Sequence, residues 1–323
     1  MTVRRAPRHG GRRQRGVALI TAVLMVALAT MLAVDVGFRG FLDQRRAGTL
    51  FALDQGYQVA LGAEAWAADF LKKDLQNSQT DHLGEIWARP LPPLPIDGGN
   101  VEGRLEDMQG RFNLNNLLNT DGTTNPVAVQ QFERMLAMLQ IEPSWATVMA
   151  DWIDQDTQPG FPDGAEDSVY TGLTPPHLTA NMPITRVSEL LVMPGFGPER
   201  YQRLKSYVTA LPAGTPLNVC TAPGVVLDAL SQDSREFSLN PDDLLRRRES
   251  ACFPTLQDLR GALGDAAFNE LQESLAETSS YFRASVWVTI GTTQFTLYSL
   301  LARGGGGPGG GAVRPVLRSF GSE

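Results

Sequence analysis

The 323-residue chain is 42% hydrophobic and 20% charged, which is the composition of a folded protein that can bury a core, and its length predicts two domains or one domain with a large insertion. Its formal net charge of −7 hides an asymmetry, because six arginines and no acidic residue precede position 17, whereas the remainder carries 22 basic and 35 acidic residues. An acidic body argues against nucleic acid as a partner, since binding of phosphates requires a basic face.

The segment from Val17 to Val34 contains no charged residue and is about as long as the shortest helix that crosses a bilayer core of roughly 30 Å. The arginines before it predict that its amino side stays in the cytoplasm and that the acidic remainder crosses the membrane. A cleavable secretory signal is the alternative, because "ALA" at 27–29 fits a small-x-small cleavage site. The apolar run continues to Phe38 without a helix breaker, and this continuity favours an anchor.

Helical spacing of apolar residues continues beyond the predicted span. Leu50, Leu53, Tyr57 and Leu61 are three or four residues apart, and no proline occurs between Pro7 and Pro90. The pattern predicts one long helix from the membrane to about Asn77.

The rest of the chain divides by composition. Prolines and glycines at 89–100 indicate a linker or a loop, and alternating apolar residues at 101–105 indicate a strand. Apolar faces of helical period dominate 113–277, where two helices are indicated by the residues Phe132, Met135, Leu136, Leu139, Trp145, Val148, Met149, Trp152 and Ile153. Strand alternation returns after Thr278, with a turn at "GTT" (291–293) and a glycine-rich loop at 304–311 before a last strand near 313–320. We therefore expect an α+β fold, in which a small antiparallel sheet packs on the long helix and a large all-α domain is inserted between its strands.

A loop after Trp152 is the most acidic part of the chain, and prolines and glycines bend it. Its acidic residues are Asp154, Asp156, Asp163, Glu166 and Asp167. Crowded carboxylates repel one another, and a calcium ion with six to eight oxygen ligands relieves that repulsion. The spacing is not that of an EF-hand, because Pro159 and Ala165 stand where a glycine and an acid belong. A solvated acidic loop remains the alternative.

The sequence gives only weak indications of a zinc site or a catalytic site. His9, His82 and His177 are scattered, so they predict neither a zinc site nor a catalytic triad. Asp154 and Glu166 could form an acid and nucleophile pair, but two acids alone do not specify catalysis, and we expect no enzymatic activity.

The segment "PGFGPERYQRLKSYV" (194–208) resembles a helix-hairpin-helix, a module that often binds the DNA backbone. Arg200, Arg203 and Lys205 could contact phosphates. The acidic surroundings favour a hairpin that serves only packing.

Cys220 and Cys252 are the only cysteines. In a chain predicted to be exported, an even pair is a candidate disulfide, whereas in the cytosol the two would more often be unrelated thiols. We predict the bridge.

The amino-terminal basic residues, Gly16 and the unbroken apolar run resemble the type III signal of prepilins and pseudopilins. The resemblance implies that a prepilin peptidase cuts after Gly16 and that the mature chain begins at an N-methylated Val17. The fifth mature position is glutamate in most of this family, whereas here it is Thr21. That departure is expected of the minor pseudopilin K family of type II secretion systems.

The body carries further matches to the same family. They are "FNLNNLL" (112–118), "DWIDQDTQPGFPDGAEDSVY" (151–170), "NMPITRVSELL" (181–191) and "LNVCTAP" (217–223). The first and last also resemble each other, which hints at two related helical units. The resemblance implies calcium in the helical domain, and on the residues present we assign Asp154, Asp156, Glu166 and Asp167 as its ligands.

From this resemblance we predict a basic leader at 1–16, a transmembrane segment at 17–38 and an inserted helical domain at 113–277. The segments 39–112 and 278–323 together would form a pseudopilin α/β domain. The resemblance implies an inner-membrane protein with its body in the periplasm, which joins minor pseudopilins I and J at the tip of the pseudopilus and starts its assembly for protein export. The alternative is a single-pass periplasmic binding module with DNA or calcium as its ligand.

Overall fold

The computed structural model describes residues 15–232, 235–304 and 311–321. Most of the predicted basic leader and the middle of the glycine-rich segment, at 1–14 and 305–310, lie outside the described residues. The chain forms two units, Met1–Gln55 and Gly56–Glu323.

Helix α1 is a single unbroken helix from Arg15 to Asn77, which confirms the prediction from proline-free helical spacing. Between Val17 and Val34 its side chains are uncharged and exposed, as at Leu19 (68% exposed) and Met25 (70%). An 18-residue window of this helix has a mean hydropathy of 2.7 and no buried residue, so the helix is long and apolar enough to cross a membrane. Apolar side chains exposed in this way favour an apolar environment around this part of the helix.

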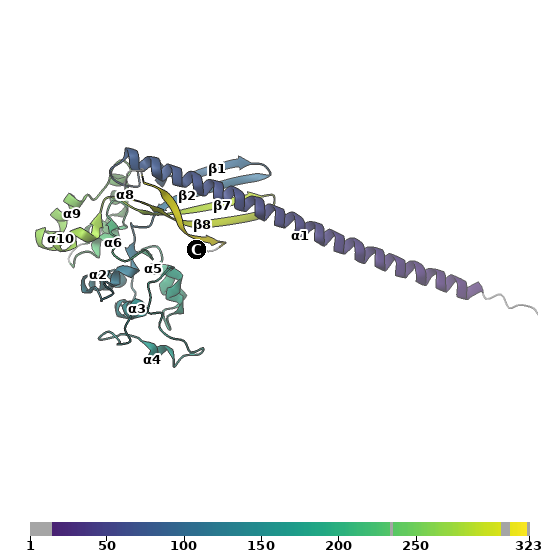
Figure 1. The fold of residues 1–323 in the computed structure, drawn as a ribbon, viewed down its shortest axis with the longest axis horizontal. Coiled ribbons are helices and arrows are strands. Elements are labelled where there is room, and N and C mark those ends of the chain that lie inside the picture. The colour runs from purple at the N-terminus through teal and green to yellow at the C-terminus, as the bar shows by residue number, and fades with distance from the viewer. Residues whose placement is uncertain (1–14, 233–234, 305–310, 322–323) are drawn as a thin grey trace, which may run out of the picture. The chain divides into compact units, whose positions relative to one another are not determined.

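The second unit contains a five-stranded antiparallel sheet with strand order β1-β2-β7-β8-β9 (Figure 1). The strands are β1 (Leu91–Ile96), β2 (Gly99–Asp107), β7 (Tyr281–Ile290), β8 (Thr293–Arg303) and β9 (Val313–Phe320). Neighbours in the sheet are also consecutive in the chain except at one step, from β2 to β7. The helices of the insertion all lie in the part of the chain between β2 and β7.

The β7–β8 hairpin occurs where the sequence predicts it. Ile290 pairs with Thr293 across a turn in which Gly291 has a φ of +57°, a conformation that glycine adopts at little cost. The alternating residues Val286 and Val288 are buried, as expected for strands with one face on a core.

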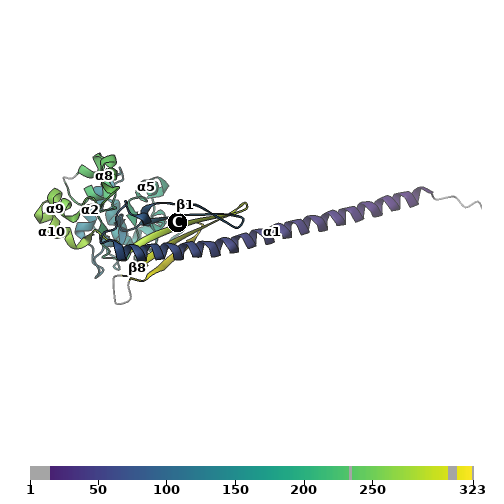
Figure 2. The same ribbon diagram turned by 90° about the horizontal axis from the view of Figure 1, so that it is seen from above.

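The part of α1 that begins at Gly56 packs on one face of the sheet (Figure 2). Ala60 joins Val101, Val286, Val288 and Leu297 in one apolar cluster, and a second cluster contains Leu71, Trp87, Phe282, Ala284 and Leu301. Gly56 allows close approach, because a Cβ at this position would lie 3.0 Å from Cβ of Phe295. The fold class is therefore as predicted.

One carboxylate on this helix face is held by the sheet. Glu64 is 4% exposed, accepts a hydrogen bond from Ser299 and binds both Nη2 (2.6 Å) and Nε (2.9 Å) of Arg318. Burial opposes ionisation of Glu64, but Arg318 and Ser299 outweigh burial and lower its pKa. A charge that is paired in this way fixes the rotation of α1 on the sheet.

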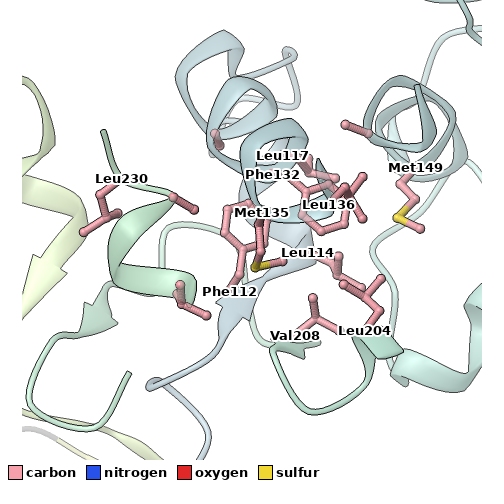
Figure 3. Close-up of a cluster of buried hydrophobic side chains, with 14 of the residues drawn as sticks. Phe112, Leu114, Leu117, Phe132, Met135, Leu136, Met149, Leu204, Val208 and Leu230 are labelled. Carbon is pink, nitrogen blue, oxygen red and sulfur yellow. The ribbon is translucent and has the colours of Figure 1, made fainter. Parts of the chain in front are cut away.

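The chain between β2 and β7 forms short helices and two small parallel strand pairs around a separate core (Figure 3). The elements are β3 (Phe112–Asn113), η2 (Leu114–Leu117), α2 (Pro126–Met138), α3 (Trp145–Ile153), α4 (Asp167–Tyr170), η3 (Val187–Val192), α5 (Gly197–Leu204), β4 (Val208–Thr209), β5 (Leu217–Asn218), α6 (Gly224–Asp228), α7 (Glu236–Leu239), α8 (Pro241–Arg248), α9 (Leu256–Leu263), α10 (Asp265–Leu271), η4 (Gln272–Ser274) and β6 (Leu275–Ala276). The predicted apolar faces of α2 and α3 meet in this core, where Phe132, Met135, Leu136 and Met149 are fully buried.

The insertion is tied to the sheet where the chain leaves and re-enters it. Asn218 Nδ2 lies 2.9 Å from both Asp107 Oδ2 at the end of β2 and Ser279 Oγ just before β7. Asp107 Oδ2 also accepts hydrogen bonds from Thr221 Oγ1 (2.6 Å) and Ser279 Oγ (2.7 Å). All four side chains are at least 90% buried. We call these four residues the junction network.

A disulfide joins Cys220 and Cys252, as predicted. It links the segment after β5 to the chain between α8 and α9, 32 residues further on.

Replacing both cysteines by alanine is expected to lower the free energy of unfolding by about 3–4 kcal/mol, because the unfolded chain loses a closed loop of this length. Urea denaturation of the variant, followed by circular dichroism, measures the loss. Wild-type protein in reducing buffer is the control and should lose a similar amount. An unchanged unfolding midpoint in both would contradict a stabilising bridge.

A buried cluster at the end of α1 makes stability depend on pH. Arg303 on β8 pairs with Asp81 and, at 3.2 Å, with Asp74, and Glu85 lies in the same acidic group. Burial, and then repulsion from Glu85 and Asp81, raises the pKa of Asp74 from 3.8 to about 7 despite the attraction of Arg303. The folded state thus holds this proton more tightly than the unfolded state, so the contribution of Asp74 to stability is present at acid pH and is lost as pH rises from about 4 to about 7.

Asp74→Asn should therefore raise the melting temperature above pH 7 and flatten its decline between about pH 4 and 7. Thermal melts across this range test the expectation. Asp69→Asn is the matched control on the same helix, because Asp69 is exposed and pairs only with Lys73 among the ion pairs of the described residues. A melting temperature that falls on Asp74→Asn at pH 8 would show that Asp74 is stabilising as a carboxylate.

Candidate metal centre

The acidic loop joins two helices of the insertion. Asp154 is the residue that caps the C-terminus of α3, and Glu166 is the residue that precedes α4. Trp152, Tyr170 and His177 lie beside the loop, with ring centroids 5.2 Å apart for Trp152 and Tyr170 and 5.4 Å apart for Tyr170 and His177.

Asp151, on the last turn of α3, holds the loop in shape. Its Oδ2 accepts hydrogen bonds from the backbone N–H groups of Gly160 (2.9 Å) and Ala165 (2.8 Å). Gly164 leaves no room for a side chain, because a Cβ there would collide with the backbone of Gly160 as well as with Asp151 Oδ2, and a Cβ at Gly160 would lie 2.7 Å from Asp151 Oδ1 and force it to move. Sequence reasoning missed Asp151, although the two loop glycines that it contacts were visible.

Three of the four predicted ligands come together. Asp154, Asp156 and Glu166 each place a carboxylate oxygen within 4.8 Å of the others. Asp154 and Glu166 are 5% and 2% exposed, whereas Asp156 is exposed.

Buried oxygens in this group lack hydrogen-bond partners. Within the described residues, Asp154 Oδ1 and Glu166 Oε1 have none. Burial, and then repulsion from Asp156, Asp151 and Glu166, raises the pKa of Asp154 to about 7. Burial also raises the pKa of Glu166, although a hydrogen bond from Thr179 acts in the opposite direction. Buried carboxylates without partners are costly, and an oxygen-only donor set of this kind suits a hard divalent cation.

The fourth predicted ligand, Asp167, lies outside this cluster. Its Oδ1 accepts hydrogen bonds from the backbone N (2.9 Å) and Oγ1 (2.8 Å) of Thr179. Thr179 Oγ1 also lies 3.0 Å from Glu166 Oε2, so Asp167 acts on the cluster through Thr179. Asp163 is exposed and lies outside the cluster as well.

Asn181 lies against the acidic loop, a contact that the sequence did not indicate. Its backbone N–H donates to Trp152 O (3.1 Å) and its Nδ2 to Asp156 O (3.4 Å), so its side chain lies against the loop. Asn181 Oδ1 is buried and has no partner among the described residues. A side-chain amide oxygen is an ordinary calcium ligand.

The predicted processing residues lie at the start of α1, where Gly16 and Val17 are in its first turn. Thr21 Oγ1 donates to the carbonyl oxygens of Val17 (3.1 Å) and Ala18 (3.0 Å). The hydroxyl is thus satisfied within its own helix.

Most of the basic side chains in the segment that resembles a helix-hairpin-helix are engaged within the protein and are not available to bind DNA. Arg200 forms a bidentate ion pair with Glu142, with N–O distances of 2.6 and 2.7 Å, and Arg203 donates a hydrogen bond to Gln140 O at 3.2 Å. Two of the three basic side chains therefore serve packing within the insertion.

The family model for protein K of the type II secretion system matches residues 110–213, which contain the acidic loop. Type II secretion system protein K of Pseudomonas aeruginosa is 34% identical over 96% of this chain and 94% of its own length, and that of Aeromonas hydrophila is 31% identical over 91% and 94%. A chain in the crystal structure of the GspK–GspI–GspJ complex from the enterotoxigenic Escherichia coli type 2 secretion system matches with a TM-score of 0.75 and 26% identity, over 86% of this chain and 100% of that one. The chain therefore belongs to the type II secretion system protein K family of minor pseudopilins.

Proposed function

We propose that this chain is the minor pseudopilin at the tip of the pseudopilus, where it starts assembly together with minor pseudopilins I and J and so serves protein export across the outer membrane. The observation that carries the proposal is the large helical insertion at the β2–β7 step of a pseudopilin sheet. Such a block is too bulky for a position along a shaft of stacked subunits. Its role is assembly rather than catalysis.

Thr21 supports a position at the tip. A subunit in the shaft uses a glutamate here to pair with the amino terminus of its neighbour, whereas a tip subunit has no subunit above it. The Thr21 hydroxyl needs no outside partner, because it bonds to Val17 and Ala18 in its own helix. An unpaired carboxylate at this depth in lipid would be expensive.

Membrane topology follows from the same helix. We infer that prepilin peptidase removes residues 1–16, that α1 stays in the inner membrane and that the body lies in the periplasm. The Cys220–Cys252 disulfide supports this orientation, because structural disulfides persist in oxidising compartments such as the periplasm.

Co-expression with minor pseudopilins I and J tests the tip position. Wild-type chain and Thr21→Ser, which keeps the hydroxyl, should co-purify with both proteins and support secretion. Thr21→Glu should reduce secretion severalfold, because it adds a carboxylate without a partner. Failure of the wild type to co-purify, or full activity of Thr21→Glu, would contradict the proposal.

We further propose that Asp154, Asp156 and Glu166 bind a structural calcium ion, with Asn181 Oδ1 as an additional ligand. The support is the set of buried carboxylate oxygens without partners and the raised pKa of Asp154. Bound calcium would supply the positive charge that the cluster lacks. Asp167, assigned as a ligand from the sequence, would contribute by orienting Thr179 against Glu166.

Calcium should raise the melting temperature of the wild type, with a stabilisation of about 2.7 kcal/mol when calcium is present at a hundred times its dissociation constant. Asp154→Asn and Glu166→Gln should abolish this response, whereas Asp163→Asn, in the same loop but outside the cluster, should keep it. In chelator, Asp154→Asn should melt above the wild type because it removes repulsion among carboxylates. A wild type that melts at the same temperature with calcium and with chelator would exclude the site.

A further inference from the structure

A cleft of about 570 Å³ lies between the sheet and the helical insertion. On the sheet side it is lined by the face opposite α1, since Arg104, Glu106 and Arg283 alternate with Leu105 and Ala284, which pack towards α1. On the insertion side it is lined by residues 185–188 before and within η3, by residues of and after α5, and by β4. Its volume is that of a site for a drug-sized ligand or a short peptide segment.

The cleft is basic in a protein that is otherwise acidic. Five cationic side chains line it and one carboxylate, Glu106, opposes them; the cations are Arg104, Arg111, Arg186, Lys205 and Arg283. Clustered like charges repel one another, and the repulsion is stronger where water is partly excluded. An anion that entered the cleft would relieve it.

Glu106 does not neutralise the cluster. Arg283 binds it at 2.6 Å, and Arg104 and Arg111 each lie 3.3 Å from it, so a single carboxylate is shared by three guanidinium groups. Burial opposes its ionisation, but Arg283, followed by Arg111 and Arg104, outweighs burial and lowers the pKa of Glu106. Glu106 is therefore charged at neutral pH, and the lining of the cleft contains more cations than carboxylates.

Two of the cations that line the cleft belong to the insertion. Arg186 Nη1 lies 3.5 Å from Ser319 Oγ, which is a neutral partner. Lys205 forms no ion pair within the part of the chain that the structure describes. Neither side chain is paired with a carboxylate among the ion pairs of the described residues, and both line the cleft.

The same cleft has an apolar floor. Met108, Leu300 and Leu317 line it, together with the rings of Tyr201 and Tyr298. A bare inorganic anion would satisfy the cations but would leave this surface in water. A ligand with carboxylates beside apolar side chains would satisfy both.

We propose that this cleft is a docking site for a segment of another protein that carries acidic side chains next to apolar ones. Charge complementarity argues for a polypeptide rather than a nucleic acid, because the body outside the leader has 35 acidic against 22 basic residues and repels a phosphate backbone. The inference rests on the lining of the cleft and does not depend on the proposed tip position.

The test uses the full chain in zwitterionic detergent and a fluorescein-labelled peptide, Glu-Leu-Asp-Leu-Glu, with Gln-Leu-Asn-Leu-Gln as the uncharged probe. Fluorescence anisotropy at low salt should show binding of the acidic peptide that is at least about tenfold tighter than binding of the amide peptide, and that weakens as salt is added. The double variant Arg186→Glu with Lys205→Glu should lose about tenfold in affinity for the acidic peptide. Its melting temperature should stay close to that of the wild type.

Lys72→Glu is the matched control, because Lys72 is an exposed cation on α1 outside the cleft. It should bind the acidic peptide as the wild type does. Equal affinity for the two peptides, or equal losses in the double variant and in Lys72→Glu, would overturn the proposal. Displacement of the acidic peptide by inorganic phosphate at equal concentration would also overturn it and would identify a site for bare anions.

Discussion

The junction network is the constraint on which the rest of the fold depends. Strands β2 and β7 are neighbours in the sheet but are separated in the chain by the whole insertion, so the point of exit and the point of return must be held together. Asn218, from the middle of the insertion, holds both by lying within 2.9 Å of Asp107 and Ser279. Burial raises the pKa of Asp107, and hydrogen bonds from Thr221, Ser279 and the backbone of Gln109 oppose that shift. A buried network of this kind is costly unless every member is satisfied, and it therefore favours a single placement of the insertion on the sheet.

The same local hydrogen-bond arrangement occurs twice in the insertion. Asn113 and Asn218 stand at the end of the short strands β3 and β5, each of which forms a parallel pair, and each side-chain oxygen accepts from a backbone N–H two residues on. The sequence likeness of "FNLNNLL" and "LNVCTAP" thus has a counterpart in backbone geometry. Of these two related halves of the insertion, the first contains the acidic loop, and the second contains the disulfide and the junction network.

Features set by residues close together in the chain could be predicted from the sequence, whereas contacts between residues far apart in the chain could not. Helix α1 and the β7–β8 hairpin follow from apolar periodicity, an absence of proline and a turn glycine, all of which act over a few residues. The acidic loop pointed to Asp154, Asp156 and Glu166, but Asp167 begins α4 and turns to Thr179, and Asn181 reaches the loop from a later segment. The basic cleft left no signal, because its side chains come from strands and loops far apart in the chain and meet only after the insertion has closed on the sheet.

We propose that α1 is the retained membrane helix of a processed pseudopilin, and the mass of the amino-terminal peptide is the decisive measurement. The protein would be isolated from membranes of cells with and without prepilin peptidase. We expect a chain that begins at N-methylated Val17 only when the peptidase is present. A chain that begins at Met1 in both cells, or at Thr30 after cleavage of an ordinary secretory signal, would contradict it.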